Sequence, residues 1–278
     1  MPYTPAIEAS LSTIWSAPDS LARQQLLAKP FIAHTVPVTH TVSTRPGEPL
    51  IALAPRTQAI HDALSLFVPN GGAGRSAVDL GCLEGGLSFE LRRAGLDVLG
   101  VEGREDNYQR CLLLKAYYAA LGGLDFHLGD VRDFRPGRTF DVVVCSGLLY
   151  HLDDPAAYIQ QLGALTSGGG LLYLDTHVAP EDCDLAESVF RPNLSAIKTG
   201  TMGGRDVRFR TYEEDVSLPE SSIGNRQSVW MDTPSHLALL HAAGFHRVFD
   251  MSGYYGADEQ GLKRRYHRRY FAALKGVV

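Results

Sequence analysis

The chain has 278 residues, of which 45% are apolar and 21% are charged, and its formal net charge is −5. This composition is typical of a folded protein and argues against a largely disordered chain. The acidic charge excludes a global positive field that attracts nucleic acid or an anionic membrane, but leaves room for a local basic patch. No apolar run reaches the roughly 18 residues of a membrane span, and the first residues lack the pattern of a signal peptide. We therefore expect a soluble, cytoplasmic protein with one large domain.

The four cysteines show no metal-ligand spacing. Cys82, Cys111, Cys145 and Cys183 contain no C-x-x-C pair, and no second set completes a zinc site. We expect reduced cysteines that act as small apolar residues, and no bound metal.

The first 70 residues are interpreted as an N-terminal helical cap. The run SLARQQLLAK predicts a helix, and an extended segment follows it. A second helix is expected over residues 56–67, where Ile60, Leu64 and Phe67 share one face. Turn residues at 69–74 then end the cap.

From residue 76 onward, strands and helices alternate. Strands are expected at residues 76–80, 97–101, 125–128, 140–145 and 171–175, and helices at 83–93, over CLLLKAYYAAL and at 155–165. Continuous apolar runs such as VVV at 142–144 suit strands that are covered on both faces, as in a parallel sheet between helical layers. The alternation predicts a doubly wound α/β domain over residues 71–278.

The alternation stops at about residues 177–233. This segment holds charges, glycines and short alternating pieces such as DVRFRTY and NRQSVWM. A structureless loop of this length is implausible in a compact domain, so we interpret it as an inserted lid with some strand content. After the insert we expect a helix at 234–243, which starts near Ser235 and ends at Gly244. Two further strands, at 246–251 and 268–275, complete a mostly parallel, seven-stranded sheet.

The sharpest motif is VDLGCLEGG at residues 78–86, between a strand and a helix, where open α/β sheets bind ligands. Its glycines let a ligand approach the backbone, and the helix N-terminus offers unpaired N–H groups. A dinucleotide site favours G-x-G-x-x-G, whereas Cys82 and Leu83 separate these glycines. The carboxylates of Asp79 and Glu84 would repel a pyrophosphate and suit a ligand with a positive amino group.

Further acids follow the next two strands. Glu102 ends the second strand, at about the 20-residue spacing from Asp79 at which an acid meets a ribose diol. Asp130 follows the third strand, and Ser146 ends the fourth. A row of acids along one rim fits a ligand with a ribose, an adenine amino group and a cationic tail.

With these motifs in order, the sequence resembles the class I S-adenosylmethionine-dependent methyltransferases, which have a Rossmann-like fold. The resemblance covers roughly residues 73–176 and the closing strands, and it rests on DLGCLEGG, Glu102, GDV at 129–131 and FDVVVCSGLLYHL from residue 140. It implies S-adenosylmethionine as the cofactor. The family more often has a further glycine where Leu83 stands.

The resemblance also implies roles for single residues. The loop from Gly81 to Gly85 would hold the methionine part of the cofactor, Glu102 the ribose hydroxyls and Asp130 the adenine amino group. An ordinary strand-end acid and turn chemistry are the alternative interpretations of Asp79 and Asp130. The predicted cofactor-binding residues are Asp79, Gly81, Cys82, Gly85, Glu102, Asp130, Val131 and Ser146.

The stretch after the fourth strand carries the catalytic candidate. Methyl transfer requires that the acceptor atom is held near the methyl carbon and that a hydroxyl or protonated amine loses its proton. His151 titrates in the useful range and is the candidate general base, and a histidine packed under the lid is the alternative. Tyr150 is interpreted as a pocket wall.

Other residues receive a structural interpretation. Asp154 before Pro155 is typical of a helix N-cap. Further pocket walls are expected at Trp230, Tyr254 and Tyr255. The basic run at 263–270 is interpreted as a solvated hairpin in preference to an RNA-binding patch.

The arginines of the insert leave three interpretations open. They hold an acidic substrate, pair with acids nearby in the insert, or pair with a partner subunit in a homodimer. The residues concerned are Arg205, Arg208 and Arg210, and the nearby acids are Glu213, Glu214 and Asp215.

The sequence thus predicts a methyltransferase that acts on an O or N atom of a small molecule or short peptide. Because GLLYHL at 147–152 also resembles a segment of enzymes that modify wobble uridine in transfer RNA, an RNA-modifying enzyme is the alternative. A binding module that keeps the cofactor fold without turnover is a third hypothesis.

Overall fold

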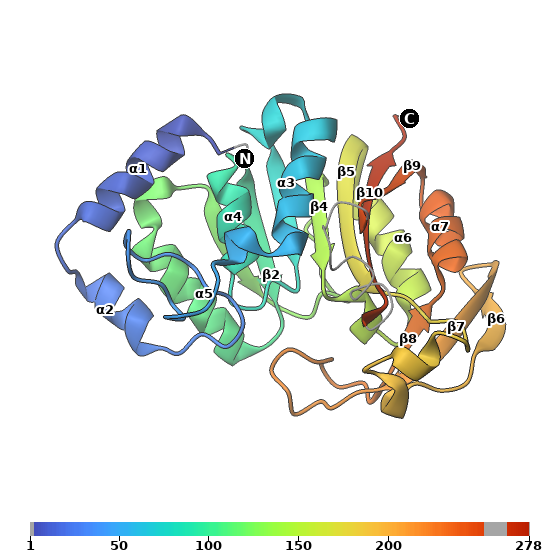
Figure 1. The fold of residues 1–278 in the computed structure, drawn as a ribbon. Helices are drawn as coiled ribbons and strands as arrows, with labels where there is room; N and C mark the ends of the chain where they lie inside the picture. Colours follow the sequence, from blue (N-terminus) through green and yellow to red (C-terminus); the bar gives the residue numbers. More distant parts are fainter. Residues whose placement is uncertain (1–2, 253–265, 278) are drawn as a thin grey trace. The chain divides into compact units, whose positions relative to one another are not determined.

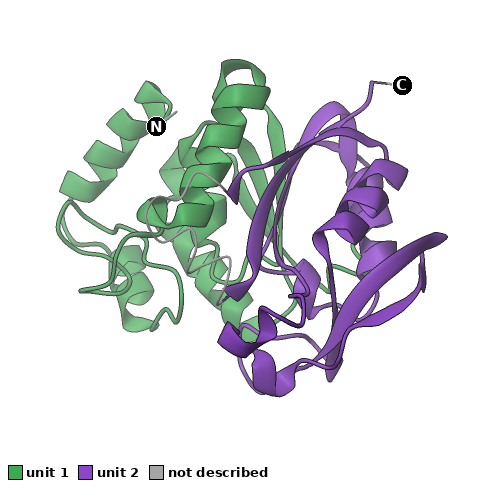
Figure 2. Ribbon diagram, turned by 45° about the vertical axis from the view of Figure 1, so that its right-hand side comes forward, with its two compact units in different colours: residues 1–135 green, residues 136–278 purple. Residues whose placement is uncertain are grey.

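The computed structural model describes residues 3–252 and 266–277 (Figure 1). The chain forms two compact units, which comprise residues 1–135 (unit 1) and 136–278 (unit 2) and are coloured separately in Figure 2. Among the described residues, no helix is both long and apolar enough to cross a membrane. Tyr254, Tyr255 and residues 263–265, for which the sequence made predictions, lie outside the described residues.

Unit 1 combines helices with three parallel strands. Strand β1 pairs with β2, and β2 pairs with β3. Helix α4 packs against β1 and β2, α5 packs against β2 and β3, and α2 packs on α5. The elements are α1 (Pro5–Ser16), α2 (Leu21–Ala28), α3 (Pro55–Phe67), β1 (Ser76–Leu80), α4 (Gly86–Arg93), β2 (Asp97–Glu102), α5 (Glu105–Tyr117) and β3 (Leu124–Leu128).

One local prediction in unit 1 needs correction. The helix predicted at 83–93 begins only at Gly86, because Leu83 and Gly85 have φ angles of 53° and 75° that a right-handed helix does not contain. The segment predicted as extended contains an isolated bridge between Pro37 and Ser43. The helix predicted at 56–67 and the strand at 76–80 are confirmed within one residue.

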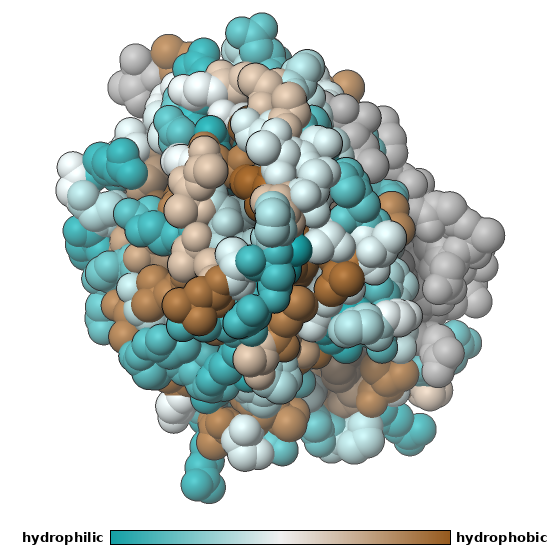
Figure 3. Space-filling view, turned by 90° about the vertical axis from the view of Figure 1, so that its left-hand side faces the viewer, coloured by the Kyte–Doolittle hydropathy of each residue, from teal (hydrophilic) through white to brown (hydrophobic). Residues whose placement is uncertain are grey.

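The N-terminal helices leave some apolar side chains exposed. Figure 3 looks onto the side on which α1 and α2 lie, where apolar residues stand among polar ones. Leu21 and Leu27 of α2 are 69% and 41% exposed. Exposed leucines interspersed with polar residues are normal on a protein surface.

Unit 2 contains four strands of the main sheet and a separate small sheet. Strand β4 runs parallel to β5, whereas β10 runs antiparallel to both β5 and β9. Helix α6 packs against β4, β5 and α7. The elements are β4 (Phe140–Ser146), α6 (Pro155–Leu165), β5 (Thr166–His177), β6 (Lys198–Met202), β7 (Arg205–Glu213), β8 (Gln227–Met231), α7 (Thr233–Ala242), β9 (Phe245–Asp250) and β10 (Arg268–Lys275).

The seven main strands follow the order β3-β2-β1-β4-β5-β10-β9. This mostly parallel sheet with helices between its strands confirms the predicted doubly wound α/β class. The strand content predicted for the insert (residues 177–233) is also confirmed, because β6, β7 and β8 form an antiparallel sheet.

Two helices of unit 2 begin with an aspartate cap. The Asp154 carboxylate accepts a hydrogen bond from the Ala157 N–H at 2.9 Å, which confirms the predicted N-cap of α6. For α7 the cap is Asp232, whose carboxylate accepts from the Ser235 N–H at 2.9 Å. The helix begins at Thr233, so Ser235 lies in its first turn, as predicted.

Candidate active site

The glycine loop (residues 81–86) joins β1 to α4. Gly85 has a φ of 75°, and a Cβ atom there would lie 2.8 Å from Phe126 Cζ, so both conformation and space require glycine. Leu83 has a φ of 53°, a left-handed conformation that costs a residue with a side chain roughly 1–2 kcal/mol. The loop therefore keeps a glycine-like backbone at Leu83 against local strain.

Asp79 organises the helix that follows this loop. It lies near the carboxyl end of β1, is 2% exposed, and its Oδ2 accepts a hydrogen bond from Ser88 Oγ at 2.6 Å. Burial raises the pKa of Asp79 to about 6, and the nearby Glu102 raises it further. The hydrogen bonds from Ser88 and the charge of Arg56 lower this pKa in part. Asp79 thus fixes the first turn of α4 with a carboxylate whose charge is costly to keep.

Glu102, the last residue of β2, binds the glycine loop directly. Its Oε2 accepts from the Leu83 N–H at 2.9 Å and its Oε1 from the Arg104 N–H at 2.8 Å, with a longer contact of 3.5 Å from Asn107 Nδ2. Burial raises the pKa of Glu102. A carboxylate offers about four acceptor positions, so Glu102 keeps the capacity to accept a hydroxyl of a ribose.

Asp130 differs from Glu102 because both of its carboxylate oxygens already accept hydrogen bonds from Arg132. Oδ1 accepts from the Arg132 backbone N–H at 2.9 Å and from Nε at 3.0 Å, and Oδ2 accepts from Nη2 at 2.6 Å. The hydrogen bonds from Arg132 lower the pKa of Asp130. An adenine amino group at Asp130 would compete with this guanidinium, and the neighbouring Val131 is buried.

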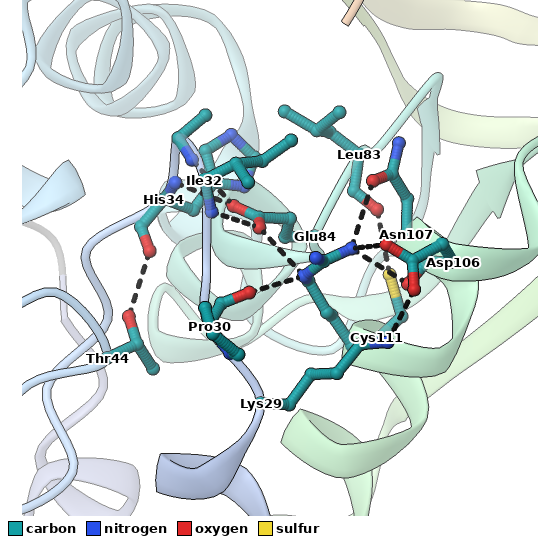
Figure 4. A network of polar contacts seen from close by, with 12 residues as sticks. Lys29, Pro30, Ile32, His34, Thr44, Leu83, Glu84, Asp106, Asn107 and Cys111 are labelled. Carbon is teal, nitrogen blue, oxygen red and sulfur yellow. Dashed lines mark hydrogen bonds and ion pairs between the residues drawn. The ribbon is translucent and has the colours of Figure 1, made fainter. Parts of the chain in front are cut away.

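Glu84 does not face a ligand, and the sequence interpretation of this residue is wrong. It is fully buried, and its carboxylate accepts the backbone N–H groups of Ile32 at 2.5 Å, Ala33 at 2.9 Å and His34 at 2.8 Å. Figure 4 shows Glu84 beside Ile32 and His34. Arg110 Nε lies 3.3 Å from the same carboxylate. Glu84 therefore anchors the N-terminal segment to the glycine loop, through contacts about 50 residues apart that a local motif does not reveal.

His34 reinforces this anchor from the other side. Its Nδ1 accepts a hydrogen bond from the Gly86 N–H at 3.1 Å. Burial lowers the pKa of His34 to about 3, so the ring is neutral and keeps this acceptor. Glu84 and His34 together define the anchor of the glycine loop.

Cys82 and Gly81 shape the loop from inside unit 1. Both N–H groups donate to the Val101 carbonyl, at 2.9 Å for Gly81 and 3.0 Å for Cys82. The Cys82 thiol is buried 3.9 Å from the Cys111 thiol, and burial raises its pKa. The Cys82 side chain thus packs as a small apolar group.

Ser146, at the end of β4 in unit 2, is engaged by a buried ion pair. Its hydroxyl donates to Asp175 Oδ2 at 2.8 Å. Asp175 is fully buried and also accepts from Arg268 Nε at 2.6 Å and Nη2 at 2.8 Å. The cofactor contact of Ser146 stays a prediction, as do those of Asp79, Gly81, Cys82, Gly85, Glu102, Asp130 and Val131.

His151 pairs with an acid that the sequence assigned elsewhere. Its Nδ1 lies 3.0 Å from both carboxylate oxygens of Glu214, which is in the insert. The His151 side chain is 16% exposed and that of Glu214 is 1% exposed. His151 is thus partly accessible and held by a buried carboxylate, whereas sequence reasoning had grouped Glu214 with the arginines of the insert.

Two arginines of the insert, Arg208 and Arg210, pair with acids other than Glu213, Glu214 and Asp215. Arg208 binds Glu181 through two contacts of 2.9 Å. Arg210 is fully buried, donates to the Pro180 carbonyl at 2.9 Å and binds Asp182 at 2.5 Å. Arg210 therefore holds the insert together and is not placed to bind an acidic substrate.

Aromatic rings surround Tyr150 beside His151. Trp230 is 1% exposed, stacks on His177 with ring centres 4.7 Å apart, and its Nε1 donates to the Tyr150 carbonyl at 2.9 Å. The Tyr150 and His151 ring centres are 4.3 Å apart. Trp230 thus holds the backbone of the half-buried Tyr150 by a hydrogen bond, and the wall role of Tyr150 stays a prediction.

No metal centre is formed within residues 3–252 and 266–277. No group of three or more His, Cys, Asp or Glu side chains is arranged there to hold a metal ion. At the glycine loop, the two buried carboxylates of Asp79 and Glu102 accept hydrogen bonds beside a tight backbone turn, and this arrangement fits an adenosine with a cationic amino-acid tail.

Comparison with known proteins agrees with this chemistry. Residues 53–255 match the family model of a methyltransferase domain. The chain is 35% identical over 109 residues to a ubiquinone biosynthesis O-methyltransferase of Methylococcus capsulatus, covering 37% of this chain and 44% of the relative. It is 26% identical over 196 residues to a tRNA U34 carboxymethyltransferase of Alteromonas mediterranea, covering 64% and 57%. The chain thus spans about half the length of these curated relatives.

Solved structures share the fold over most of the chain. The N-terminal domain of EvdMO1, crystallised in the presence of SAH and D-fucose, has a TM-score of 0.62 and 21% identity, and the match covers 92% of this chain and 94% of that one. An S-adenosylmethionine-dependent methyltransferase of Mesorhizobium loti has a TM-score of 0.53 and 18% identity, with 78% and 98% covered. From the family match, the sheet order and the loop, the chain belongs to the class I S-adenosylmethionine-dependent methyltransferases.

Proposed function

We propose that this protein transfers a methyl group from S-adenosylmethionine to an O or N atom of a small molecule or short peptide. The observation that carries the cofactor part is Glu102, a buried carboxylate that binds the glycine-loop backbone and keeps acceptor capacity. Hydrogen bonds from ribose hydroxyls to such a carboxylate suit both partners. The glycine loop and Asp79 would receive the methionine part.

The residues of unit 2 supply the acceptor chemistry in this proposal. When bound, S-adenosylmethionine supplies an electrophilic methyl carbon, and the electron pair of the broken C–S bond leaves with sulfur. His151 Nε2 accepts the proton that the acceptor hydroxyl or ammonium loses. The lone pair of the acceptor O or N atom can then bond to the methyl carbon. Tyr150 would form a wall of the acceptor pocket.

Two observations favour a small acceptor over nucleic acid. The net charge is −5, and the insert arginines Arg208 and Arg210 are neutralised by Glu181 and Asp182. A surface that binds nucleic acid needs cations that can contact phosphates. The relative named for ubiquinone biosynthesis supports an oxygen acceptor. The predicted homodimer and the predicted cytoplasmic location stay predictions.

RNA modification is the second candidate function. It is favoured by the relative named as a tRNA U34 carboxymethyltransferase, whose match covers 64% of this chain. Binding to transfer RNA in that case has to fall steeply with salt, because phosphate contacts release counterions.

One assay separates these functions. Methyl transfer from radiolabelled S-adenosylmethionine is measured on a panel of small hydroxyl and amine compounds, short peptides and bulk transfer RNA at 50 and 200 mM salt. Transfer to a small compound or peptide supports the proposal. Transfer to RNA with steep salt dependence replaces it with the second candidate, and cofactor binding without transfer to any acceptor leaves a binding module.

A further inference from the structure

His151 and Glu214 form a pair that is built by unit 2 alone. His151 lies in a short 3-10 turn (Leu149–His151) after β4, and Glu214 directly follows β7. Both Glu214 carboxylate oxygens lie 3.0 Å from His151 Nδ1. The nearly equal distances place the ring nitrogen centrally opposite the carboxylate.

This geometry selects one form of the imidazole. An ionised carboxylate only accepts hydrogen bonds, so the proton of a neutral His151 ring lies on Nδ1. The lone pair then lies on Nε2, and Nε2 is the atom that can take a proton from an acceptor. The carboxylate also stabilises the imidazolium that forms after this transfer.

The pair is held in place by neighbouring segments of the insert. The Glu214 N–H donates to the Arg226 carbonyl at 2.9 Å. Asn225 Nδ2 donates at 2.9 Å to both the His151 carbonyl and the Gln227 carbonyl. The segment that fixes the carboxylate thus also fixes the backbone of the histidine, which limits their relative motion.

We propose that Glu214 is a positioning residue that holds His151 in the Nδ1-protonated form and so presents Nε2 as the general base. The inference rests on the proposed function in its catalytic part only. The tautomer follows from the pair itself and can be measured without any acceptor.

The neighbouring Glu213 provides a matched control. It is exposed and its Oε1 accepts from Gln227 Nε2 at 2.6 Å. Glu213→Gln removes the same charge one residue away without contact to His151. Glu214→Gln removes the charge at the histidine while keeping the shape of the side chain, and Glu214→Asp keeps the charge on a shorter stem.

The first measurement is the ring nitrogen spectrum of the full-length protein labelled with ¹⁵N-histidine, with His151 assigned by its loss in His151→Gln. We expect a protonated Nδ1 and an unprotonated Nε2 in the wild-type protein and in Glu213→Gln. We expect Glu214→Gln to shift the His151 signals towards the other tautomer, while its thermal unfolding stays cooperative. A wild-type ring protonated on Nε2, or a spectrum unchanged by Glu214→Gln, overturns the proposal.

The second measurement is turnover with an acceptor found in the panel assay. We expect Glu214→Gln to lower kcat roughly 10- to 1,000-fold with KM changed less than about threefold, because a wrong tautomer impairs proton transfer more than binding. Glu214→Asp should regain part of kcat, and Glu213→Gln should match the wild type. An unchanged kcat with an altered tautomer overturns the catalytic role of Glu214. Absence of any acceptor contradicts the proposed function, while the spectrum still decides the tautomer.

Discussion

The glycine loop of unit 1 and the His151 pair of unit 2 use buried carboxylates in different ways. Glu102 binds backbone N–H groups of its own neighbourhood and retains acceptor capacity. The Glu214 carboxylate contacts another side chain, the imidazole of His151. Under the proposed function, the first region binds the cofactor and the second transfers a proton. The two regions can therefore be broken separately, one without losing turnover chemistry and the other without losing cofactor affinity.

The largest expected effect separates the two regions from the catalytic side. His151→Ala should lower turnover by roughly 10²- to 10⁴-fold, because it removes the proposed general base. The affinity for S-adenosylhomocysteine, measured by calorimetry, should stay within about twofold of the wild type. Turnover close to wild type across pH would instead assign His151 to packing.

The next effect concerns the anchor of the glycine loop. Glu84→Gln should lower the free energy of unfolding by about 3 kcal/mol, because the three backbone N–H groups and Arg110 lose a buried charged partner. Urea unfolding measures the change. Glu48→Gln is the control, since the Glu48 side chain is 55% exposed and its ion pair with Arg45 is long, at 3.9 Å. We expect this variant to change the free energy of unfolding by less than about 0.5 kcal/mol. A loss below about 1 kcal/mol for Glu84→Gln contradicts an anchoring role.

The loop acids also predict a dependence of stability on pH. The pKa of Asp79 is about 6 in the folded protein, against 3.8 without the fold. Because the unfolded chain ionises first, Asp79 lowers stability as pH rises from about 4 to 6, by roughly 2–3 kcal/mol. Asp79→Asn keeps an acceptor for Ser88 Oγ and removes this titration.

We therefore expect Asp79→Asn to gain stability over the wild type at pH 7.5 and to lose most of that gain at pH 4.5, in the protein without added cofactor. Thermal unfolding at both pH values checks the sign. If the stability of both proteins depended on pH in the same way, the raised pKa could not be assigned to Asp79.

The smallest effect tests the strained turn. Leu83→Gly should change the free energy of unfolding by less than about 1 kcal/mol, because relief at a φ of 53° offsets the lost side-chain packing. Leu87→Gly, in the first turn of α4, should cost more than about 2 kcal/mol, because removing this buried side chain leaves a cavity. Equal losses in the two variants, measured by urea unfolding, would remove the argument for strain at Leu83.

How far the sequence predicts each region follows from the range of its contacts. The strand Ser76–Leu80 and the helix Pro155–Leu165 were predictable because apolar runs and a capping Asp154-Pro155 pair are local signals. The glycine loop was recognisable for the same reason, since Gly81 to Glu102 form a short continuous unit.

Other features depend on partners that sequence patterns do not name. Glu84 and Glu102 look alike as acids beside glycines, yet Glu84 binds backbone about 50 residues away. His151 and Glu214 are 63 residues apart in the sequence. The hydrogen bonds from Arg132 to Asp130 depend on side-chain geometry that the motif GDV does not encode. Helix α1 (Pro5–Ser16) was not predicted, and it buries only Ile7 and Leu11.

The most direct test of the central claim is a calorimetric titration of S-adenosylhomocysteine into the wild-type protein and into Glu102→Ala. We predict saturable binding to the wild type and a binding free energy weaker by about 1–3 kcal/mol in the variant, since hydrogen bonds to a charged group are lost. The unfolding temperature of the variant without ligand serves as its folding control. An unchanged affinity in a folded Glu102→Ala, or no binding to the wild type, would contradict the account.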